Sequence, residues 1–499
     1  MFAVNHCGGF AFWPTNVTVP GWGRYNYSVA FAGPALQSRD IVAEFVASCK
    51  AVGIQAGLYL NLGMNMFLDA GSNGNPHSVV PTGRNQICWD PKGYNKPLLP
   101  GQAQVTLEEY QTILLAMMTE LLGGGYGNDL AEVWFDGGYP APLAAPIADL
   151  LDAHQPNAVA FQGPNIRSNG ARARVHAPKS KAGTSNNNGG SSGSSSSADY
   201  NADGKANVAN ISSAKQPAAA AAAAEDTTYD GNAVRWAGTE TGHTPNLDMW
   251  STVADAGPGA SGSAFGNGVG DPDGAIFMPA EQDGAIQAGA NEGGFWYPGE
   301  SAKSIAELVA EYEDSVGHNC NFMLELSPDR DGAIPAADLL AYRGFGAVLA
   351  RCYSLDAAVA LTNGTVTTNN QMLTLVLAAG GVDRLLIKED VEHFGQQVRS
   401  YAVSMMAPAA TQPPSPSRVQ GRGTDNSSSS SSSDGASAAG WTVIAKGASI
   451  GHARIHRLGS PLPAGTKLKL ELLEVASWPP VIRTFGAFAQ SACVGELHQ

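Results

Sequence analysis

Two acidic residues follow apolar runs that we predict to be strands. Asp136 comes directly after Val133–Phe135, and Glu240 comes shortly after Ala233–Ala237. Two carboxyl groups from different strands are able to cleave a glycosidic bond, because one stabilises or attacks the sugar cation while the other protonates the departing oxygen. A plainer interpretation stays open, in which Asp136 begins an Asp-Gly-Gly turn and Glu240 is a surface carboxylate.

Aromatic residues near the predicted strand ends favour a sugar as the ligand. Indole rings are broad and apolar with one N–H donor, so they stack on the C–H faces of pyranose rings. Each tryptophan alone also fits a place in the hydrophobic core. The aromatic residues at or just beyond the strand ends are Trp13, Tyr59, Trp134, Trp236 and Trp296.

Other catalytic chemistries lack their motifs in this sequence. The histidines His6, His243 and His318 are scattered, and no His-Glu-x-x-His occurs, so no metal site is predicted. No Gly-x-Ser-x-Gly nucleophile elbow is present. No glycine-rich phosphate loop follows a predicted strand, so we expect no nicotinamide cofactor. The sequence therefore predicts neither a metal nor an organic cofactor.

Short apolar runs alternate with amphipathic helical stretches over the first ~350 residues, which is typical of a parallel sheet with helices outside. Such alternation favours an α/β fold of the (β/α)8, TIM-like barrel type over a doubly wound open sheet. In such a barrel the active site lies at the carboxyl ends of the strands. The predicted strands are Phe2–Asn5, Gln55–Leu62, Leu130–Phe135, Ala158–Phe161, Ala233–Ala237, Ala275–Met278 and Asn321–Leu326. Further polar residues at their ends are His6, Asn61, Glu281 and Asp283.

Three amphipathic stretches are predicted to be helices between these strands. They are Arg39–Val52, Thr106–Leu122 and Ser301–Val316. The second begins with Thr106 and carries Glu109 three residues later, the pattern of a capping box.

The pattern changes near residue 350, which predicts two domains. Residues 1–350 form the catalytic barrel, with a low-complexity insertion at about 168–229. Residues 351–499 show alternating strands and turns, which predicts an antiparallel β-sandwich with a second low-complexity insertion at about 408–438. The insertions are rich in Ser, Ala, Gly and Pro and bury too little apolar surface to order themselves.

Composition excludes several classes of partner. The 499 residues carry 29 Lys and Arg against 44 Asp and Glu, a formal net charge of −15, so nucleic-acid binding is not expected. No apolar run approaches the ~18 residues of a membrane span, and the first residues do not read as a signal peptide. The six cysteines are widely spaced, which argues against a zinc ribbon or a disulfide scaffold. Glycosylation sequons begin at Asn16, Asn26 and Asn363.

Many segments resemble, in the same order, the α-L-fucosidases of glycoside hydrolase family 29. His6–Pro14 resembles that family's His-His-Asp-Gly-Phe-x-x-Trp-Pro segment, Glu132–Gly137 its nucleophile strand, and Arg235–Glu240 its Arg-Trp-x-Gly-x-Glu motif. The resemblance covers nearly the whole chain outside the insertions. Further similar segments are Asp40–Phe45, Gly53–Tyr59, Pro279–Asp283, Ser315–Asn319, Pro328–Gly332, Val382–Arg384 and Ser449–His452.

The resemblance implies a retaining exo-glycosidase that removes terminal α-L-fucose from a fucosylated glycan. Asp136 is then the nucleophile and Glu240 the acid/base, and the compartment is extracellular or a lysosome- or vacuole-like lumen. The oligomeric state is left open. The residues that the resemblance assigns to substrate binding are His6, Trp13, Tyr59, Trp134 and Trp236.

Three departures from the family pattern leave an alternative open. The family's barrel has a further strand before the paired histidines, so we expect a barrel lacking its first strand. His6-Cys7 stands where the family has two histidines, with Gly8 in place of Asp. Gln282 also replaces a residue that is often Cys. The alternative is an N-terminally truncated, catalytically inactive, fucosidase-like carbohydrate-binding protein.

Overall fold

The structure is a computed structural model, and all described residues belong to one compact unit. The described residues are 1–37, 39–63, 65–69, 101–136, 138–161, 165–166, 228–229, 232–253, 268–274, 276–289, 296–353, 367–369, 372–408, 440–476 and 481–489. Almost all of the two predicted insertions lies outside these residues, as does the sequon at Asn363.

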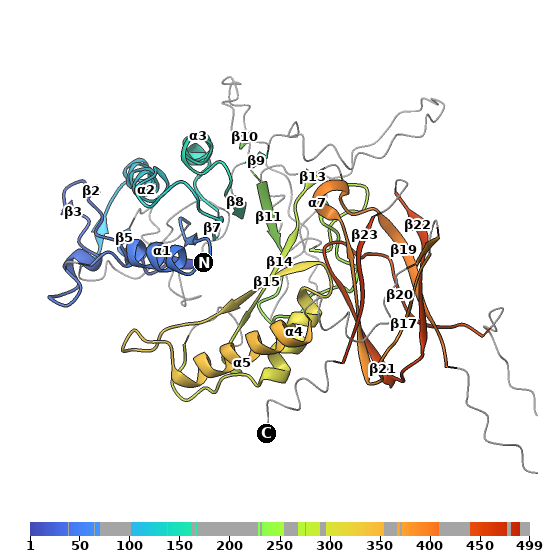
Figure 1. The fold of residues 1–499 in the computed structure, drawn as a ribbon. Helices are drawn as coiled ribbons and strands as arrows, with labels where there is room; N and C mark the ends of the chain where they lie inside the picture. Colours follow the sequence, from blue (N-terminus) through green and yellow to red (C-terminus); the bar gives the residue numbers. More distant parts are fainter. Residues whose placement is uncertain are drawn as a thin grey trace, which may run out of the picture. The chain divides into compact units, whose positions relative to one another are not determined.

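A seven-stranded parallel sheet forms the first part of the fold (Figure 1). Neighbouring strands in the sheet follow one another along the chain, in the order β1-β4-β7-β8-β11-β14-β15. The sheet is curled and is consistent with part of a TIM barrel, as the alternation of strands and helices predicts. The strands are β1 (Phe2–Asn5), β4 (Gly57–Leu60), β7 (Glu132–Phe135), β8 (Val159–Phe161), β11 (Asn232–Trp236), β14 (Ala280–Ala285) and β15 (Cys320–Glu325).

The sixth strand of this sheet is not the predicted one. The predicted run Ala275–Met278 contains only β13 (Ile276–Phe277), which pairs antiparallel with β12 (Thr252–Val253) outside the sheet. The strand in the sheet is β14, which carries Glu-Gln-Asp at its second to fourth positions, and all six of its residues are buried. A search for apolar runs misses such a strand, because its polar residues are buried by the neighbouring strands and not by their own hydrophobicity.

Helices pack outside the sheet, and each of the three predicted stretches contains one. Thr106 and Glu109 form the expected capping box at the start of α2. The third predicted helix begins later than expected, since Ser304 and not Ser301 caps it. The helices are α1 (Ile41–Ala51), α2 (Leu107–Leu122), α3 (Ala144–His154), α4 (Ile305–Ser315) and α5 (Ala336–Cys352). None of the helices in the described part of the chain has the length and apolar character needed to cross a bilayer.

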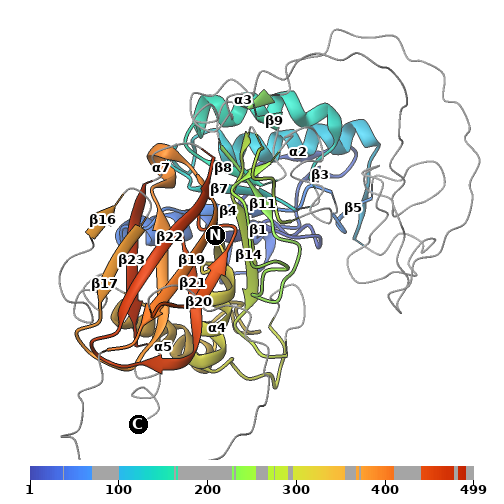
Figure 2. The same cartoon turned by 90° about the vertical axis from the view of Figure 1, so that its right-hand side faces the viewer.

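Residues after 353 form two antiparallel sheets (Figure 2). The two sheets contribute side chains to one hydrophobic cluster, including Leu375, Leu470 and Phe485. One sheet contains β16 (Thr367–Asn369), β17 (Met372–Val376), β22 (Lys467–Val475), β19 (Val398–Met406) and β20 (Thr442–Gly447), and the other contains β21 (Arg454–Leu462), β18 (Val382–Glu389) and β23 (Ile482–Phe488).

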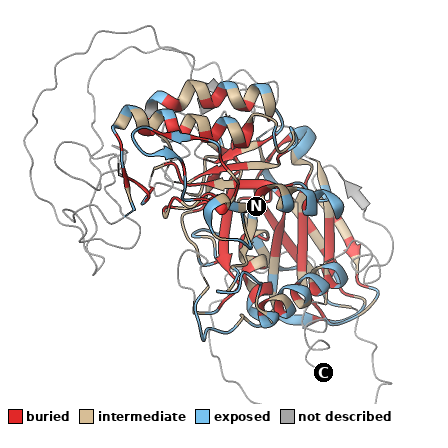
Figure 3. Cartoon of the chain, turned by 90° about the vertical axis from the view of Figure 1, so that its left-hand side faces the viewer, coloured by how far each residue is buried: buried red, intermediate tan, exposed pale blue. Residues whose placement is uncertain are grey.

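The remaining elements are short. They are β2 (Thr18–Val19), β3 (Gly23–Arg24), β5 (Leu68–Asp69), β6 (Ala103–Gln104), β9 (Asn165–Ile166), β10 (Thr228–Tyr229), the 3-10 turns Val29–Phe31 and Ala141–Leu143, and α7 (Val391–Phe394). Figure 3 shows that the buried residues concentrate in the strands and on the inner faces of the helices.

Polar contacts join the parallel sheet to the antiparallel sheets. The amide of Asn319, just before β15, donates to the Met249 carbonyl and to Gln396, and its oxygen accepts from the backbone N–H of His452 at 2.8 Å. The carboxylate of Glu313 in α4 is buried and accepts from Arg384 of β18 at 2.6 Å. Arg457 of β21 donates to the other oxygen of Glu313. The two parts therefore share buried polar groups.

Candidate active site

Asp136 lies at the carboxyl end of β7, where two neighbouring side chains orient its carboxylate. The Tyr59 hydroxyl and the Asn61 amide both donate to Asp136 Oδ2, the latter at 3.1 Å. The backbone N–H of Asp136 donates to the Leu60 carbonyl at 2.8 Å. Burial, and then the nearby Asp136, raise the pKa of Tyr59 well above its ordinary value, so the phenol stays a donor. Two donors on one oxygen suit an ionised carboxylate whose second oxygen points elsewhere.

His6 follows β1 and belongs to the same group of side chains. Its ring stacks on Tyr59, with centroids 5.5 Å apart and an angle of 3° between the planes. Burial lowers the pKa of His6, with Asp136 acting in the opposite direction, so the ring is neutral near pH 7. Its Nδ1 lies 2.9 Å from Cys7 Sγ. Cys7 is disulfide-bonded and has no thiol proton, so Nδ1 must be the donor and Nε2 carries the lone pair.

Two of the predicted tryptophans share one apolar cluster beside Asp136. Trp134 lies against Phe161, with ring centroids 3.8 Å apart, and Val234 completes the buried part. Tyr59 and Trp236 pack on this cluster. The structure therefore brings together three of the predicted aromatic residues on the inner face of the parallel sheet.

Trp13 occupies a different place from the other predicted aromatic residues. It is buried in the core formed with the first helices, and its indole N–H donates to Glu120 of α2 at 2.8 Å. The sequence pattern shared with the family does not show whether the indole ring of a tryptophan near a strand end faces the core or the substrate site. A sugar contact of Trp13 stays a prediction.

Glu240 lies on the loop after β11, and Asp283 of β14 links it to Asp136 electrostatically. Asp283 is buried and its Oδ1 accepts from the Trp236 indole at 2.6 Å. Burial, and then the charges of Glu240 and Asp136, raise the pKa of Asp283 to about 7. Because electrostatic coupling falls steeply with distance, these three carboxyl groups share one neighbourhood.

Glu325 at the end of β15 extends this acidic group. Burial, followed by the charges of Asp283 and Glu240, raises the pKa of Glu325 to about 8. The sequence points to Asp283 as a polar residue near a strand end but gives no role to it or to Glu325. Both residues could be identified from the sequence by searching for acidic residues on strands that lie next to strands already predicted in the sheet.

No cluster of three or more His, Cys, Asp or Glu side chains in the described ranges has the geometry to hold a metal ion. Four cysteines lie in those ranges. Cys7 and Cys352 are disulfide-bonded, whereas Cys49 and Cys320 are free and buried. The wide spacing of the cysteines thus hides individual disulfides, since only the fold shows which distant segments approach one another.

Comparison with known proteins begins with the N-terminal half of the chain. Residues 1–240 match the family model described as Alpha-L-fucosidase. The chain is also 25% identical over 371 residues to alpha-L-fucosidase 1 of Arabidopsis thaliana, an alignment that covers 72% of this chain and 50% of the plant protein. The chain resembles the family 29 α-L-fucosidases.

Solved structures of the family share the fold. A Ruminococcus gnavus glycoside hydrolase family 29 fucosidase, solved in complex with fucose, superposes with a TM-score of 0.60 at 17% identity and covers 99% of this chain and 82% of that chain. A glycoside hydrolase family 29 member from an unknown rumen bacterium has a TM-score of 0.59 at 18% identity, covering 98% and 66% of the two chains. The chain spans about half the length of the curated relatives that it matches.

Proposed function

We propose that the protein is an α-L-fucosidase, a retaining exo-glycosidase that releases terminal α-L-fucose from fucosylated glycans. The observation that carries this proposal is the Asp136 carboxylate, held by Tyr59 and Asn61 and coupled through Asp283 to Glu240. The family resemblance and the shared fold support it. Two carboxyl groups roughly 5–5.5 Å apart are what a retaining mechanism requires.

In the first proposed step, the ionised Asp136 attacks the anomeric carbon of fucose. The bond from this carbon to the glycosidic oxygen breaks, and Glu240 gives its proton to that oxygen. The Tyr59 and Asn61 donors occupy Oδ2, so Oδ1 is the oxygen that forms the ester. Asp283 favours the protonated acid, because its own charge above about pH 7 opposes ionisation of Glu240.

In the second proposed step, ionised Glu240 takes a proton from water while the water oxygen bonds to the anomeric carbon. The ester bond breaks, and Asp136 leaves as a carboxylate. The lone pair on His6 Nε2 suits a hydroxyl of the sugar, and Trp134 and Trp236 supply apolar surface for its C–H face. No cofactor takes part in either step.

The rest of the chain fits this proposal. We infer that residues 1–350 are the catalytic barrel and 351–499 a β-sandwich, because the two antiparallel sheets share one hydrophobic cluster. The disulfide-bonded Cys7 and Cys352 favour an oxidising compartment, such as the extracellular space or a lysosome-like lumen.

Release of nitrophenol from 4-nitrophenyl α-L-fucoside tests the proposal. We expect release by the wild-type protein and loss of it in Asp136→Gly. Asp129→Gly is the matched control, since Asp129 is an exposed aspartate just before β7, and we expect that variant to stay active. A folded wild-type protein that releases no nitrophenol contradicts the proposal.

Azide rescue separates the two carboxyl groups. In Glu240→Ala, azide replaces water on the fucosyl ester after two displacements, and we expect α-fucosyl azide. In Asp136→Gly, azide attacks the activated substrate directly, and we expect β-fucosyl azide. Exchanged products contradict the assignment of the two roles.

A second candidate is a fucose-binding protein without turnover. It is favoured by Cys7, whose disulfide-bonded sulfur stands where the family has a second histidine. Calorimetric binding of fucose by a folded protein that releases no nitrophenol identifies this case.

A further inference from the structure

Gln282 on β14 holds the loop that carries Glu240. We name residues 237–244 the acid loop. The Gln282 side chain is fully buried, and its Nε2 donates to the carbonyl of Thr239 and, at 2.9 Å, to the Thr239 hydroxyl. Thr239 directly precedes Glu240, so the Gln282 amide binds the backbone one residue before the Glu240 carboxyl group.

The direction of these hydrogen bonds is fixed by the neighbouring groups. The Thr239 hydroxyl donates to the His243 carbonyl at 2.8 Å, so it is an acceptor toward Gln282. The Thr239 carbonyl is an acceptor as well. Only the NH2 end of the Gln282 amide suits two acceptors, so its oxygen cannot take this place.

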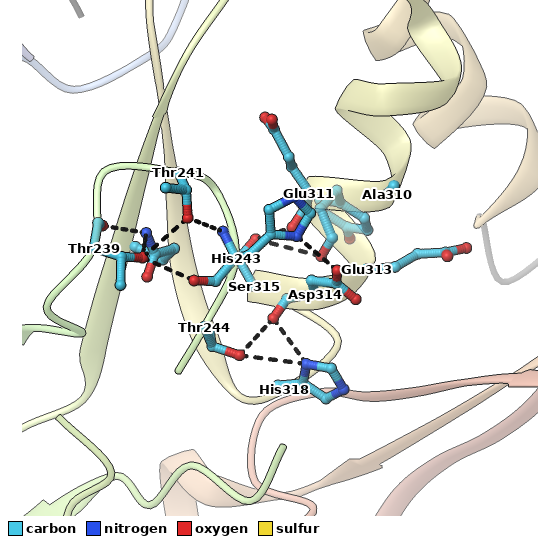
Figure 4. A network of polar contacts seen from close by, with 12 residues as sticks. Thr239, Thr241, His243, Thr244, Ala310, Glu311, Glu313, Asp314, Ser315 and His318 are labelled. Atoms are coloured by element: carbon cyan, nitrogen blue, oxygen red, sulfur yellow. Dashed lines mark hydrogen bonds and ion pairs between the residues drawn. The ribbon is translucent and has the colours of Figure 1, made fainter. Parts of the chain in front are cut away.

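The rest of the acid loop is held independently of Gln282. The Gly242 N–H donates to the Asp283 carbonyl at 2.8 Å. His243 pairs with Asp314 of α4, with Nδ1 and Oδ2 2.7 Å apart, and the Thr244 hydroxyl donates to the Asp314 carbonyl at 2.8 Å (Figure 4). The loop therefore stays folded on β14 and α4 when the Gln282 amide is removed. The position of Thr239, in contrast, depends on that amide.

We propose that Gln282 is a positioning residue for proton transfer by Glu240, an inference that rests on the proposed function. Proton transfer requires a hydrogen-bond distance between the acid and the glycosidic oxygen, and a displacement near 1 Å costs up to about 100-fold in rate. Gln282 acts through Thr239 and touches no reacting atom.

The test uses two substrates that differ in their need for an acid. The leaving group of an alkyl α-L-fucoside is an alkoxide, which needs protonation by the acid in order to depart. The leaving group of 2,4-dinitrophenyl α-L-fucoside is 2,4-dinitrophenolate, which departs without protonation. Gln282→Met keeps the side-chain length and removes the two hydrogen bonds to Thr239, together with a third to the Asp283 carbonyl. We expect kcat/KM to fall about 30-fold on the alkyl substrate and less than about 2-fold on the dinitrophenyl substrate. The constant kcat/KM reports the first displacement, in which the acid acts.

Gln287→Met is the matched control. Gln287 is also buried after β14, but its amide oxygen accepts from the Tyr297 N–H and its amide donates to Asp338, away from the acid loop. We expect equal effects of this variant on both substrates. Equal losses on both substrates for Gln282→Met, or no loss on the alkyl substrate, overturn the inference.

Two further variants keep the inference falsifiable if Gln282→Met does not fold. Thr239→Val removes the hydroxyl acceptor and keeps the carbonyl, so we expect a smaller loss of about 5-fold, again confined to the alkyl substrate. Gln282→Glu sets a carboxylate against two acceptors, and we expect its alkyl activity, relative to Gln282→Met, to recover as the pH falls and the carboxyl group becomes a donor. Wild-type protein that cleaves neither substrate overturns the proposed function itself, and the inference with it.

Discussion

Strands β7 and β14 of the parallel sheet carry acidic residues at both their carboxyl and amino ends, and the surroundings of these residues differ between the two ends. At the carboxyl end, Asp136 and Asp283 receive hydrogen bonds from Tyr59, Asn61 and Trp236. At the amino end, the buried Glu281 and the half-buried Glu132 hydrogen-bond to each other, and Glu281 also hydrogen-bonds to Asn321. Burial raises the pKa of both, and in Glu281 the neighbouring Glu132 raises it further.

The difference between the two ends is the supply of donors. Tyr59 O–H and Asn61 N–H donate to Asp136 and Trp236 N–H donates to Asp283, whereas at the amino end the carboxyl groups of Glu132 and Glu281 hydrogen-bond to each other. One oxygen on each of Glu132 and Glu281 has no hydrogen-bond partner among the described residues. Residue type alone does not make a nucleophile, because burial, neighbouring charges and hydrogen-bond donors together set the protonation of a carboxyl group.

The largest expected effect compares one residue from each end of β7. Asp136→Asn removes the proposed nucleophile, and we expect kcat/KM to fall by roughly 10⁴-fold or more. Glu132→Gln changes a carboxyl group of the amino end, and we expect less than about 3-fold, since that group touches no reacting atom. Steady-state kinetics on an aryl α-L-fucoside measure both. A large loss in Glu132→Gln would show that the two ends do not differ in function.

The next effect tests the donors of the carboxyl end. Tyr59→Phe removes one hydrogen bond to the Asp136 carboxylate, which is worth about 1.5–3 kcal/mol when the acceptor is charged. We expect kcat to fall about 10–100-fold while the stacking with His6 persists, because the ring remains. Tyr297→Phe is a suitable control, since Tyr297 is exposed. Unchanged kcat in Tyr59→Phe would remove the phenol from the argument.

The pH dependence of stability tests the buried carboxyl groups of both ends. The folded protein keeps protons on Glu281, Glu325 and Asp283 that the unfolded chain releases above about pH 4, so raising the pH favours the unfolded chain. We expect the free energy of unfolding to fall between pH 5 and pH 8 by about 1.4 kcal/mol per pH unit for each group between its two pKa values. Urea denaturation at several pH values measures this slope.

Glu281→Gln provides the matched variant for the stability measurement. The amide donates to Glu132 without holding a titrating proton, so we expect a shallower slope and a higher free energy of unfolding at pH 8. An unchanged slope would mean that the pair at the amino end does not hold the proton.

The smallest effect concerns Asp283. Asp283→Asn keeps an acceptor for the Trp236 indole and removes the charge that opposes ionisation of Glu240 above about pH 7. We expect the alkaline limb of the kcat/KM profile to move to lower pH by about half a unit to one unit. A shift to higher pH would contradict the proposed coupling.

Local signals in the sequence are reliable where a short stretch determines the structure. The capping box of Thr106 and Glu109, the strand Phe2–Asn5, and the strand Glu132–Phe135 within the predicted run Leu130–Phe135 need only neighbours along the chain. The strand β14 was not predicted, because its Glu-Gln-Asp core takes its burial from the surrounding sheet.

The candidate site depends on contacts between distant residues. Tyr59 and Asp136 are 77 positions apart, and Trp236 and Asp283 are 47 apart. The sequence places each at a strand end, but the strand order determines which of them meet. Gln282 illustrates the limit, since its contact with Thr239 is apparent only once the acid loop lies on β14.

Glu313 has a consequence for the part of the chain after residue 353. Its buried carboxylate is neutralised by Arg384 and Arg457, which both come from the antiparallel sheets. A polypeptide ending after α5 lacks both arginine partners of the Glu313 carboxylate, and its Asn319 amide lacks Gln396. The antiparallel sheets thus supply the positive charges that neutralise Glu313 of α4. We therefore expect the two parts to melt in a single calorimetric transition.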